Sequence, residues 1–314
     1  MDIKLKKGTN RRKVQENLFC FAMIFVFVIQ WAIFFVYANV NSVRLAFTQY
    51  NPVSAKHNLL PMNKLFANFA EFFGDLFSSP QGGKYFLNGA IIHLITSMIC
   101  LPLNYIFAFL IYKKMRLTAA FKIIMYLPVI LSGMVTTLMF KYFIEWNIAD
   151  LAQNVGIKFP YVFTDRAWNM LTVCIYSFFF GQTLSLVVLG TMARVPSELI
   201  EVGNLEGISL FREFRMVVIP MIFPVLQVQC LGMFVGFFTV QGPLYALYGG
   251  AAPDNVRTFG YHLFVSVIGG DVPKSKEFMY GYTSAANLSI GLISVPIVQL
   301  TKRLFDRFDP QAEY

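Results

Sequence analysis

The sequence predicts an all-α integral membrane protein with six transmembrane helices and both termini in the cytoplasm. Three observations lead to this prediction: the apolar composition, the length of the apolar runs, and the distribution of basic residues. Of the 314 residues, 56% are hydrophobic and only 14% are charged, and the mean hydropathy is +0.57. A soluble domain has about a quarter of its residues charged, so this composition favours the lipid bilayer.

Six apolar runs are long enough to cross the bilayer as helices. A span needs about 20 apolar residues, because a rise of about 1.5 Å per residue must cover roughly 30 Å of hydrocarbon. The runs are too long for barrel strands, and a helix satisfies its own backbone hydrogen bonds in lipid. The predicted spans are residues 18–40, 86–112, 121–144, 168–193, 216–242 and 283–301.

Basic residues gather at the amino terminus and in alternate connections between the spans. Because positively charged loops stay in the cytoplasm, these segments and both termini are expected on that side. The net charge of +9 then reflects topology and attraction to anionic lipid, and no basic patch indicates a nucleic-acid partner. The basic residues are Lys4, Lys6, Lys7, Arg11, Arg12, Lys13, Lys113, Lys114, Arg116, Lys122, Arg194, Arg212, Arg215, Lys302, Arg303 and Arg307.

The chain is expected to form a single transmembrane domain, residues 18–314, behind a basic cytoplasmic tail, residues 1–17. The first span has a basic flank like that of a signal peptide. Its apolar run is too long and lacks a clear cleavage site, so we expect it to remain as an anchor. The four cysteines lie singly within apolar runs, which is typical of core residues rather than of metal or disulfide sites.

Two long connections are expected outside the membrane. In the first, residues 62–77 have helical periodicity, with an apolar face that includes Phe72 and a polar face that includes Asn68. This helix either lies in the membrane interface or forms a docking surface for an extracytoplasmic partner. The second connection, residues 243–282, is rich in Gly, Pro and Tyr, and it either contacts a soluble protein or packs down as a lid.

Neither enzymatic nor ion-coupled chemistry is indicated. The motifs HExxH, GxSxG and GxxxxGK[ST] are absent, and the three histidines are scattered. The last three predicted spans contain no Asp, Glu, Lys or Arg, whereas an ion-coupled carrier normally needs such a residue in mid-membrane. If ATP drives transport, a different subunit must bind it. An ion-coupled secondary transporter is therefore the less favoured alternative.

Aromatic and weakly polar residues recur at helical spacing in the fourth and fifth predicted spans. They form either an ordinary bundle core or the lining of a pathway for an uncharged solute with hydroxyl groups. The candidate pathway residues are Tyr176, Phe180 and Thr183 in the fourth span, and Gln229, Met233, Phe237 and Val240 in the fifth.

The charged segment SELIEVGNLEGISLFREFRMVVIP, residues 197–220, interrupts this apolar sequence. A helix is expected to begin at Ser197 and to end near Gly207, before a second helix that leads to Pro220. The first helix has only about ten residues, which is too short to be stable alone in water. It nevertheless carries the apolar residues Leu199, Ile200, Val202 and Leu205. An amphipathic helix of this kind is expected to lie in the groove of a partner protein.

At this segment the sequence resembles the EAA loop of permease subunits of binding-protein-dependent ABC importers. The family pattern is Glu-Ala-Ala, three residues, Gly, nine residues, Ile, one residue and Leu-Pro, and Glu201, Gly207 and Pro220 match it. A Gly at position 203 is expected to weaken the helix by about 1 kcal/mol relative to Ala. The departures from the pattern are Val202 and Gly203 for Ala-Ala, Glu206 for Asp, and Ile208 for Ala.

The stretches NSVRLAFTQYNP after the first span and MYLPVILSGMVTTLMFKYF in the third are similar to the carbohydrate-uptake, maltose-permease-like branch of this family. The resemblance implies a type I importer permease fold in a bacterial cytoplasmic membrane. It implies a second permease subunit, two copies of an ABC ATPase subunit and an extracytoplasmic solute-binding protein as partners. ATP and Mg are expected in the ATPase subunits, and no cofactor or metal in this chain.

The resemblance also implies that a coupling loop, about residues 196–215, contacts the ATPase, and it implies which residues do so. Glu201 and Gly207 are the family's coupling positions, and Gly203 and Pro220 occupy motif positions. Glu206 and Arg212 are further expected surface contacts. An oligosaccharide or glycan fragment is the expected solute, with a peptide or a glycerophosphodiester as the alternative, because the coupling motif carries no information about the substrate.

Overall fold

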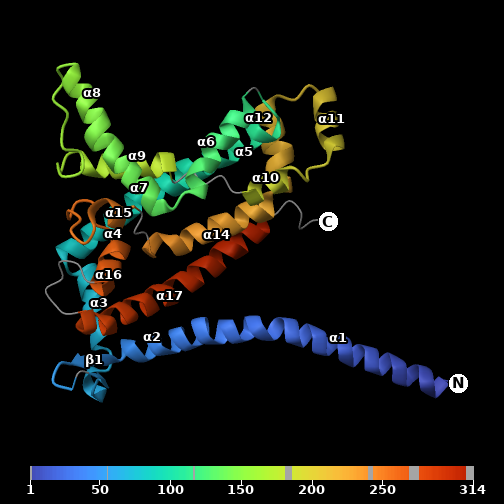
Figure 1. Cartoon of the computed structure of the whole chain (residues 1–314), viewed down its shortest axis with the longest axis horizontal. Helices are drawn as coiled ribbons and strands as arrows, with labels where there is room; N and C mark the ends of the chain where they lie inside the picture. Colours follow the sequence, from blue (N-terminus) through green and yellow to red (C-terminus); the bar gives the residue numbers. More distant parts are fainter. Residues whose placement is uncertain are drawn as a thin grey trace.

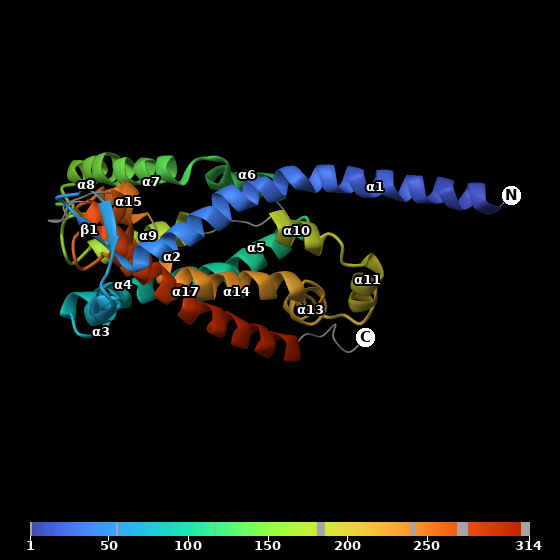
Figure 2. The same cartoon turned by 90° about the horizontal axis from the view of Figure 1, so that it is seen from below.

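The structure is a computed structural model that describes residues 2–54, 56–115, 117–180, 186–239, 243–268 and 276–308. It is largely helical, as the composition predicts, and contains one two-stranded sheet. The charged loop contains the helix α11 (Ser197–Leu205) and lies at one end of the molecule, called here the α11 end. The sheet and the helices α3 (Ala67–Phe77) and α15 (Leu244–Tyr248) lie at the opposite end, called here the far end (Figures 1 and 2).

The first span is one long helix that projects away from the other helices (Figure 1). Its carboxyl-terminal part packs against α17 (Lys276–Arg307). The apolar side chains over the expected span of 18–40 are mostly exposed, which suits a surface that contacts lipid or another subunit. The helix consists of α1 (Asp2–Trp31), the π-helical turn η1 (Ala32–Tyr37) and α2 (Ala38–Ala46).

The second span is a continuous helix of 33 residues, Pro80–Tyr112. It begins before the expected boundary because Ser79 caps it: the amide of Gln81 donates a hydrogen bond to Ser79 Oγ at 3.3 Å, with Pro80 in the first turn. Its parts are α4 (Pro80–Leu94), the π-helical turn η3 (Ile95–Cys100) and α5 (Leu101–Tyr112).

The third expected span is broken rather than straight. Its two halves meet at an angle of 100°. Leu131 and Ser132, at the break, have extended backbone conformations, and Pro128 just before them lacks the amide that would continue the helical hydrogen bonds. The pieces are α6 (Thr118–Ile130), α7 (Gly133–Tyr142), η4 (Phe143–Ile148) and α8 (Ala149–Asn154).

The fifth expected span also bends, by 80°, near Ile222. The fourth corresponds to two shorter helices, and residues 181–185 between them lie outside the described part of the chain. By length and composition the described residues support three spanning helices, or up to five if each bent pair counts as one span. The count of six spans therefore stays a prediction. The remaining pieces are α9 (Asn169–Phe180), α10 (Leu186–Met192), α11 (Ser197–Leu205), α12 (Leu210–Glu213), η5 (Phe214–Val218), α13 (Ile219–Met221) and α14 (Phe223–Thr239).

Of the periodic stretch 62–77 at the far end, residues 67–77 form the predicted α-helix, and residues 62–64 form a 3-10 turn before it. This helix packs against α4 and α17, and Phe72 of its apolar face is only 1% exposed. Its polar face is also engaged, because Asn68 Nδ2 donates hydrogen bonds to the carbonyls of Ala46 and Thr48 at 2.8 and 3.0 Å. The elements here are β1 (Thr48–Asn51), antiparallel to β2 (Lys56–Leu59), then η2 (Met62–Lys64) and α3 (Ala67–Phe77).

The second long connection packs down onto the helices over residues 243–268. It contains α15 (Leu244–Tyr248) and α16 (Phe259–Ile268). Leu244 and Tyr261 are fully buried in a core cluster that also contains Val173 and Tyr176 of α9. The lid alternative therefore describes this part of the connection, and residues 269–275 lie outside the described part of the chain.

Candidate functional site

The charged segment forms the short helix that its sequence predicts, α11, which lies beyond α10 and α12 at the α11 end (Figures 1 and 2). Gly207, just after the helix, has a φ of +67°, which a residue with a side chain rarely adopts. The amide of Ile208 donates to the carbonyl of Gly203 at 3.1 Å, a bond typical of a helix that ends in a left-handed Gly. The glycine of the motif is therefore a requirement of the backbone.

Gly203 is buried and faces the side chain of Ile208. A Cβ atom at position 203 would lie 2.7 Å from Ile208 Cδ1 and 3.2 Å from Cγ1, closer than side-chain carbons approach each other. The two departures from the family pattern, Gly203 for Ala and Ile208 for Ala, are therefore complementary in volume. The larger residue at position 208 occupies space that the smaller residue at 203 leaves free.

The outward face of α11 combines apolar and acidic side chains. Leu199, Val202 and Leu205 are 44%, 53% and 88% exposed, and Glu201 and Glu206 are exposed beside them. A helix this short gains most of its stability from packing, so an exposed apolar face of this kind suits the groove of another protein. Of the residues predicted for coupling, Glu201 and Gly203 lie on α11 and Glu206 and Gly207 follow it directly. Arg212 is exposed on the next helix, α12.

After α11 the chain continues through α12 and bends toward α14. Ser209 caps α12 by accepting a hydrogen bond from the amide of Arg212 at 3.4 Å. Pro220 lies in α13 directly after the π-helical η5 and has no amide to donate, which weakens the regular helical bonding there. The second helix, expected from Leu210 to Ile219, is therefore present but partly π-helical, and Pro220 precedes the bend at Ile222.

A buried ion pair ties the coupling loop to the second span. Lys113 Nζ, directly after α5, donates hydrogen bonds to both carboxylate oxygens of Glu213 at 2.9 and 3.0 Å. Glu213 is only 1% exposed, and the ring of Phe214 beside it lies 5.0 Å from that of Phe109 in α5. Sequence reasoning missed the pair because 100 residues separate its members. The position of this acid in the first turn after the Ser209 cap is the one signal that could have marked Glu213.

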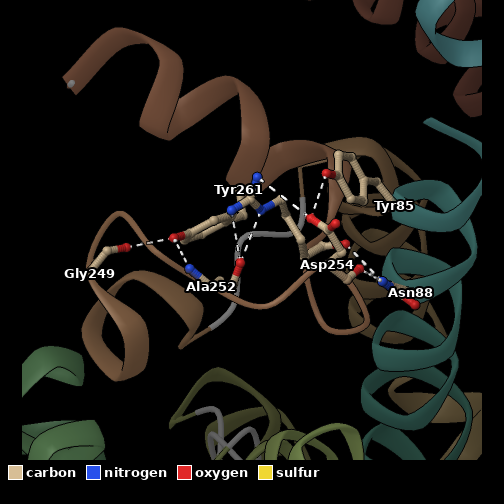
Figure 3. Close-up of polar contacts among 7 residues, drawn as sticks. Tyr85, Asn88, Gly249, Ala252, Asp254 and Tyr261 are labelled. Atoms are coloured by element: carbon tan, nitrogen blue, oxygen red, sulfur yellow. Dashed lines mark hydrogen bonds and ion pairs between the residues drawn. The ribbon is translucent and has the colours of Figure 1, made fainter. Parts of the chain in front are cut away.

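A second polar network holds the loop after α15 against the start of α4 at the far end (Figure 3). The hydroxyl of Tyr85 donates to Asp254 Oδ1 at 3.0 Å, and Asn88 Nδ2 donates to the carbonyls of Asp254 and Arg257 at 3.1 and 2.9 Å. Arg257 lies 3.8 Å from the same carboxylate. Four groups from two distant segments are therefore fixed together here.

Tyr261 fixes the other side of this loop. Its hydroxyl donates to the carbonyl of Gly249 at 2.7 Å and accepts from the amide of Ala252 at 3.1 Å (Figure 3). The guanidinium of Arg257 also donates to the carbonyl of Ala252, at 2.8 Å from Nη2. The loop is rigid because its own backbone groups are satisfied by buried side chains.

A cavity of about 670 Å³ lies between α8 and the segment that follows it at the far end. Exposed aromatic groups, Trp146 and Tyr161, line it together with the charged residues Glu145 and Lys158. A second cavity, which shares Glu145, is lined by Tyr248, and burial together with the nearby Glu145 carboxylate raises the pKa of Tyr248, so its phenol stays neutral. None of the described candidate pathway residues lines the larger cavity.

The candidate pathway residues fall into two groups that flank α4 and α5. In α9, the rings of Tyr176 and Phe180 stack at 4.9 Å and pack against Phe140 of α7. In α14, Gln229 accepts a hydrogen bond from the hydroxyl of Tyr105 at 3.0 Å.

Phe237, further along α14, packs edge-on against Phe86 and His93 of α4. Met233 is half-buried in the same helix, whereas Thr183 and Val240 lie outside the described part of the chain. Packing accounts for most of the contacts that these residues make within this chain. In the part of the chain that the structure describes, no three His, Cys, Asp or Glu side chains gather as they would around a metal ion.

Several known permease proteins of sugar transport systems are similar to this chain in sequence. No protein-family model matches the chain. The chain is 22% identical over 304 residues to the multiple sugar-binding transport system permease protein MsmF of Streptococcus mutans, which covers 93% of this chain and 98% of that protein. It is 24% identical over 194 residues to the galactooligosaccharides transport system permease protein GanP of Bacillus subtilis, covering 60% of this chain and 46% of that protein.

A solved structure has the same fold. One chain of a bacterial alginate ABC transporter, determined in complex with a periplasmic protein bound to alginate pentasaccharide, superposes with a TM-score of 0.74 at 16% identity. The superposition covers 95% of this chain and 98% of that chain. The permease fold implied by the coupling loop is therefore present over nearly the whole sequence, and the resemblance to permease subunits of carbohydrate ABC transporters is confirmed.

Proposed function

We propose that this chain is a permease subunit of an ATP-driven importer and, with a second permease, forms the pathway for an oligosaccharide or glycan fragment. The observation that carries the proposal is α11, a short helix with an exposed apolar and acidic face, stopped by Gly207 at the position where the family's coupling loop has its glycine. Two ATPase subunits bind this helix and its counterpart in the second permease, and they supply the ATP and Mg.

The carbohydrate assignment rests on the relatives and on the chemistry of the far end. MsmF and GanP are sugar permeases by name, and the similar solved transporter holds a sugar-loaded periplasmic protein. Exposed aromatic rings beside carboxylate and ammonium groups, as in the cavity with Trp146 and Tyr161, suit the flat faces and hydroxyls of a sugar. An extracytoplasmic solute-binding protein delivers the solute to this side. A non-sugar solute is the second candidate, because the coupling residues on α11 carry no information about which solute is transported.

Co-purification tests the proposal. An affinity-tagged full chain, solubilised from its native bacterial membrane, should bring down an ABC ATPase and a second permease in stable stoichiometry. Isolation of the chain alone, with full transport activity after reconstitution, would instead show a solo carrier. Leu205→Glu on the exposed face of α11 should release the ATPase while the second permease stays bound. Val155→Glu, at a residue that is 75% exposed at the far end, is the matched control and should retain both.

A further inference from the structure

The second span is attached at both ends to loops that belong to the other half of the chain. It is one continuous helix of 33 residues, and its length of about 50 Å is enough to reach across the bilayer. At the α11 end Lys113 binds Glu213 of the coupling loop. At the far end Tyr85 and Asn88 bind the loop that contains Asp254. Segments 100 or more residues away in sequence therefore meet this helix at each end.

The contact at the α11 end consists of two hydrogen bonds between charged groups and of aromatic packing beside them. Both oxygens of Glu213 are bonded to Lys113 at 2.9 and 3.0 Å, and the carboxylate is almost completely buried. Phe214 and Phe109 pack next to the pair. Val218 lies in the same buried cluster as residues of α5 and α10, so both flanks of the coupling loop are packed against α5. Separating the pair would leave the buried carboxylate of Glu213 without a partner charge, so the two elements should move together rather than slide.

The contact at the far end holds a structured loop, not a single side chain. Asn88 donates to two carbonyls of the loop, and Tyr85 donates to the carboxylate of Asp254 (Figure 3). Tyr261 and Arg257 bond other backbone groups of the same loop. A displacement of α4 therefore displaces this loop as a unit.

We propose that Lys113 and Glu213 form the joint through which the coupling loop moves the second span and, by way of α4, the loop around Asp254. This inference rests on the proposed function, because the ATPase supplies the movement of α11. Lys113 and Glu213 act as positioning residues: they contact neither ATP nor solute, and they convert displacement of α12 into displacement of α5.

The test uses the assembled transporter with a cysteine reporter on the far-end loop. Ala251 is exposed, and Ala251→Cys in a Cys20→Ser background gives a maleimide-reactive site next to Ala252. With Lys113 and Glu213 intact, ATP should change the labelling rate of this cysteine by about fivefold or more, the usual size of coupling between two sites. Glu213→Gln should abolish the ATP-dependent difference while the ATPase still co-purifies. The exchanged pair Lys113→Glu with Glu213→Lys should restore it.

Lys114→Gln is the matched control, because Lys114 is the neighbouring residue and is exposed. It should leave the ATP-dependent difference unchanged. A normal difference in Glu213→Gln would overturn the proposal, and so would loss of ATPase binding in that variant, which would assign the pair a purely structural role. Absence of an ATPase from the preparation with both residues intact would instead contradict the proposed function.

Discussion

Two residues of the coupling loop, Gly203 and Ile208, account together for two departures from the EAA pattern that this sequence resembles. Gly203 was expected to weaken α11 relative to Ala, and helix propensity alone supports that expectation. The structure adds a reason for the substitution, because a Cβ at position 203 would lie 2.7 Å from Ile208 Cδ1. The small residue Gly203 therefore makes room for the larger residue Ile208, so the two departures from the pattern belong together.

The Gly203 and Ile208 pair makes a testable prediction. Gly203→Ala alone should give little or no stabilisation of α11, because the gained helix propensity is offset by the contact with Ile208. The double variant Gly203→Ala with Ile208→Ala should regain about 1 kcal/mol, which corresponds to roughly fivefold slower amide exchange over residues 197–205. Hydrogen–deuterium exchange of the purified chain measures this difference. Equal slowing in the single variant would show that Ile208 moves aside without cost.

The left-handed backbone conformation of Gly207 predicts how substitutions at this position affect transport. Its φ of +67° is unfavourable by about 1–2 kcal/mol for a residue with a Cβ, and most of all for a β-branched one. Gly207→Val should insert into the membrane normally but lose ATP-driven uptake. Gly207→Asn, which adopts the left-handed conformation more readily, should retain more of it. Uptake by Gly207→Val equal to that of the unaltered chain would remove Gly207 from the coupling mechanism.

Two neighbouring aromatic residues of helix α9 allow a test of whether this helix only packs in the bundle core or also lines the solute pathway. Phe180 stacks on Tyr176 and faces Phe140, whereas its neighbour Phe179 is 63% exposed on a different side of the helix. If α9 lines the pathway, Phe180→Ala should lower uptake by about tenfold or more while the ATPase still co-purifies. Phe179→Ala is the matched control and should transport normally. Unchanged uptake in Phe180→Ala would assign this aromatic group to the bundle core.

We expect the stability of the chain to depend on pH through His262 of α16. Burial lowers the pKa of His262, with a further contribution from Arg257 that the carboxylate of Asp75 opposes. In the unfolded chain the imidazole takes up a proton as the pH falls through about 6.5, but in the folded chain it does so only at a lower pH. The unfolded state then binds more protons, so stability should fall as the pH drops below that value.

Thermal unfolding in detergent measures this dependence. The midpoint should decrease between about pH 7.5 and about pH 5.5, the range in which histidine titrates. His262→Gln should flatten the decrease, because the titrating group is removed from α16. A slope that is the same in both proteins would place the pH dependence on other groups.

Across the whole chain, the features that could be predicted are those that depend on the sequence of one local segment, such as the position and the end of a helix. Hydropathy located the helices of the first, second and sixth expected spans, the last of which, 283–301, lies within α17. The position of Gly207 located the end of α11. The break at Leu131 was not predicted, because hydropathy does not record a change of direction within an apolar run. The packing of residues 243–268 was left open, since the Gly and Pro residues of a tight lid resemble those of a free loop.

The polar contacts that join distant parts of the chain could not be predicted. Lys113 looked like one more basic residue of a cytoplasmic loop, and Asp254 like a turn residue. Each acquires its role from a distant partner: Glu213 lies 100 residues from Lys113, and Tyr85 lies 169 residues from Asp254. Pairings of this kind depend on the three-dimensional arrangement of the helices, which the sequence pattern of one segment does not contain.

The central claim is that α11 is the surface on which the ATPase acts. Photo-crosslinking from position 205 in living cells tests it most directly, because Leu205 is 88% exposed. A photoreactive amino acid there should give one main adduct with an ABC ATPase. The same group at position 77, where Phe77 is 79% exposed at the far end, should give no ATPase adduct. If position 205 yields no ATPase adduct from cells in which the ATPase co-purifies with the chain, α11 is not the coupling surface.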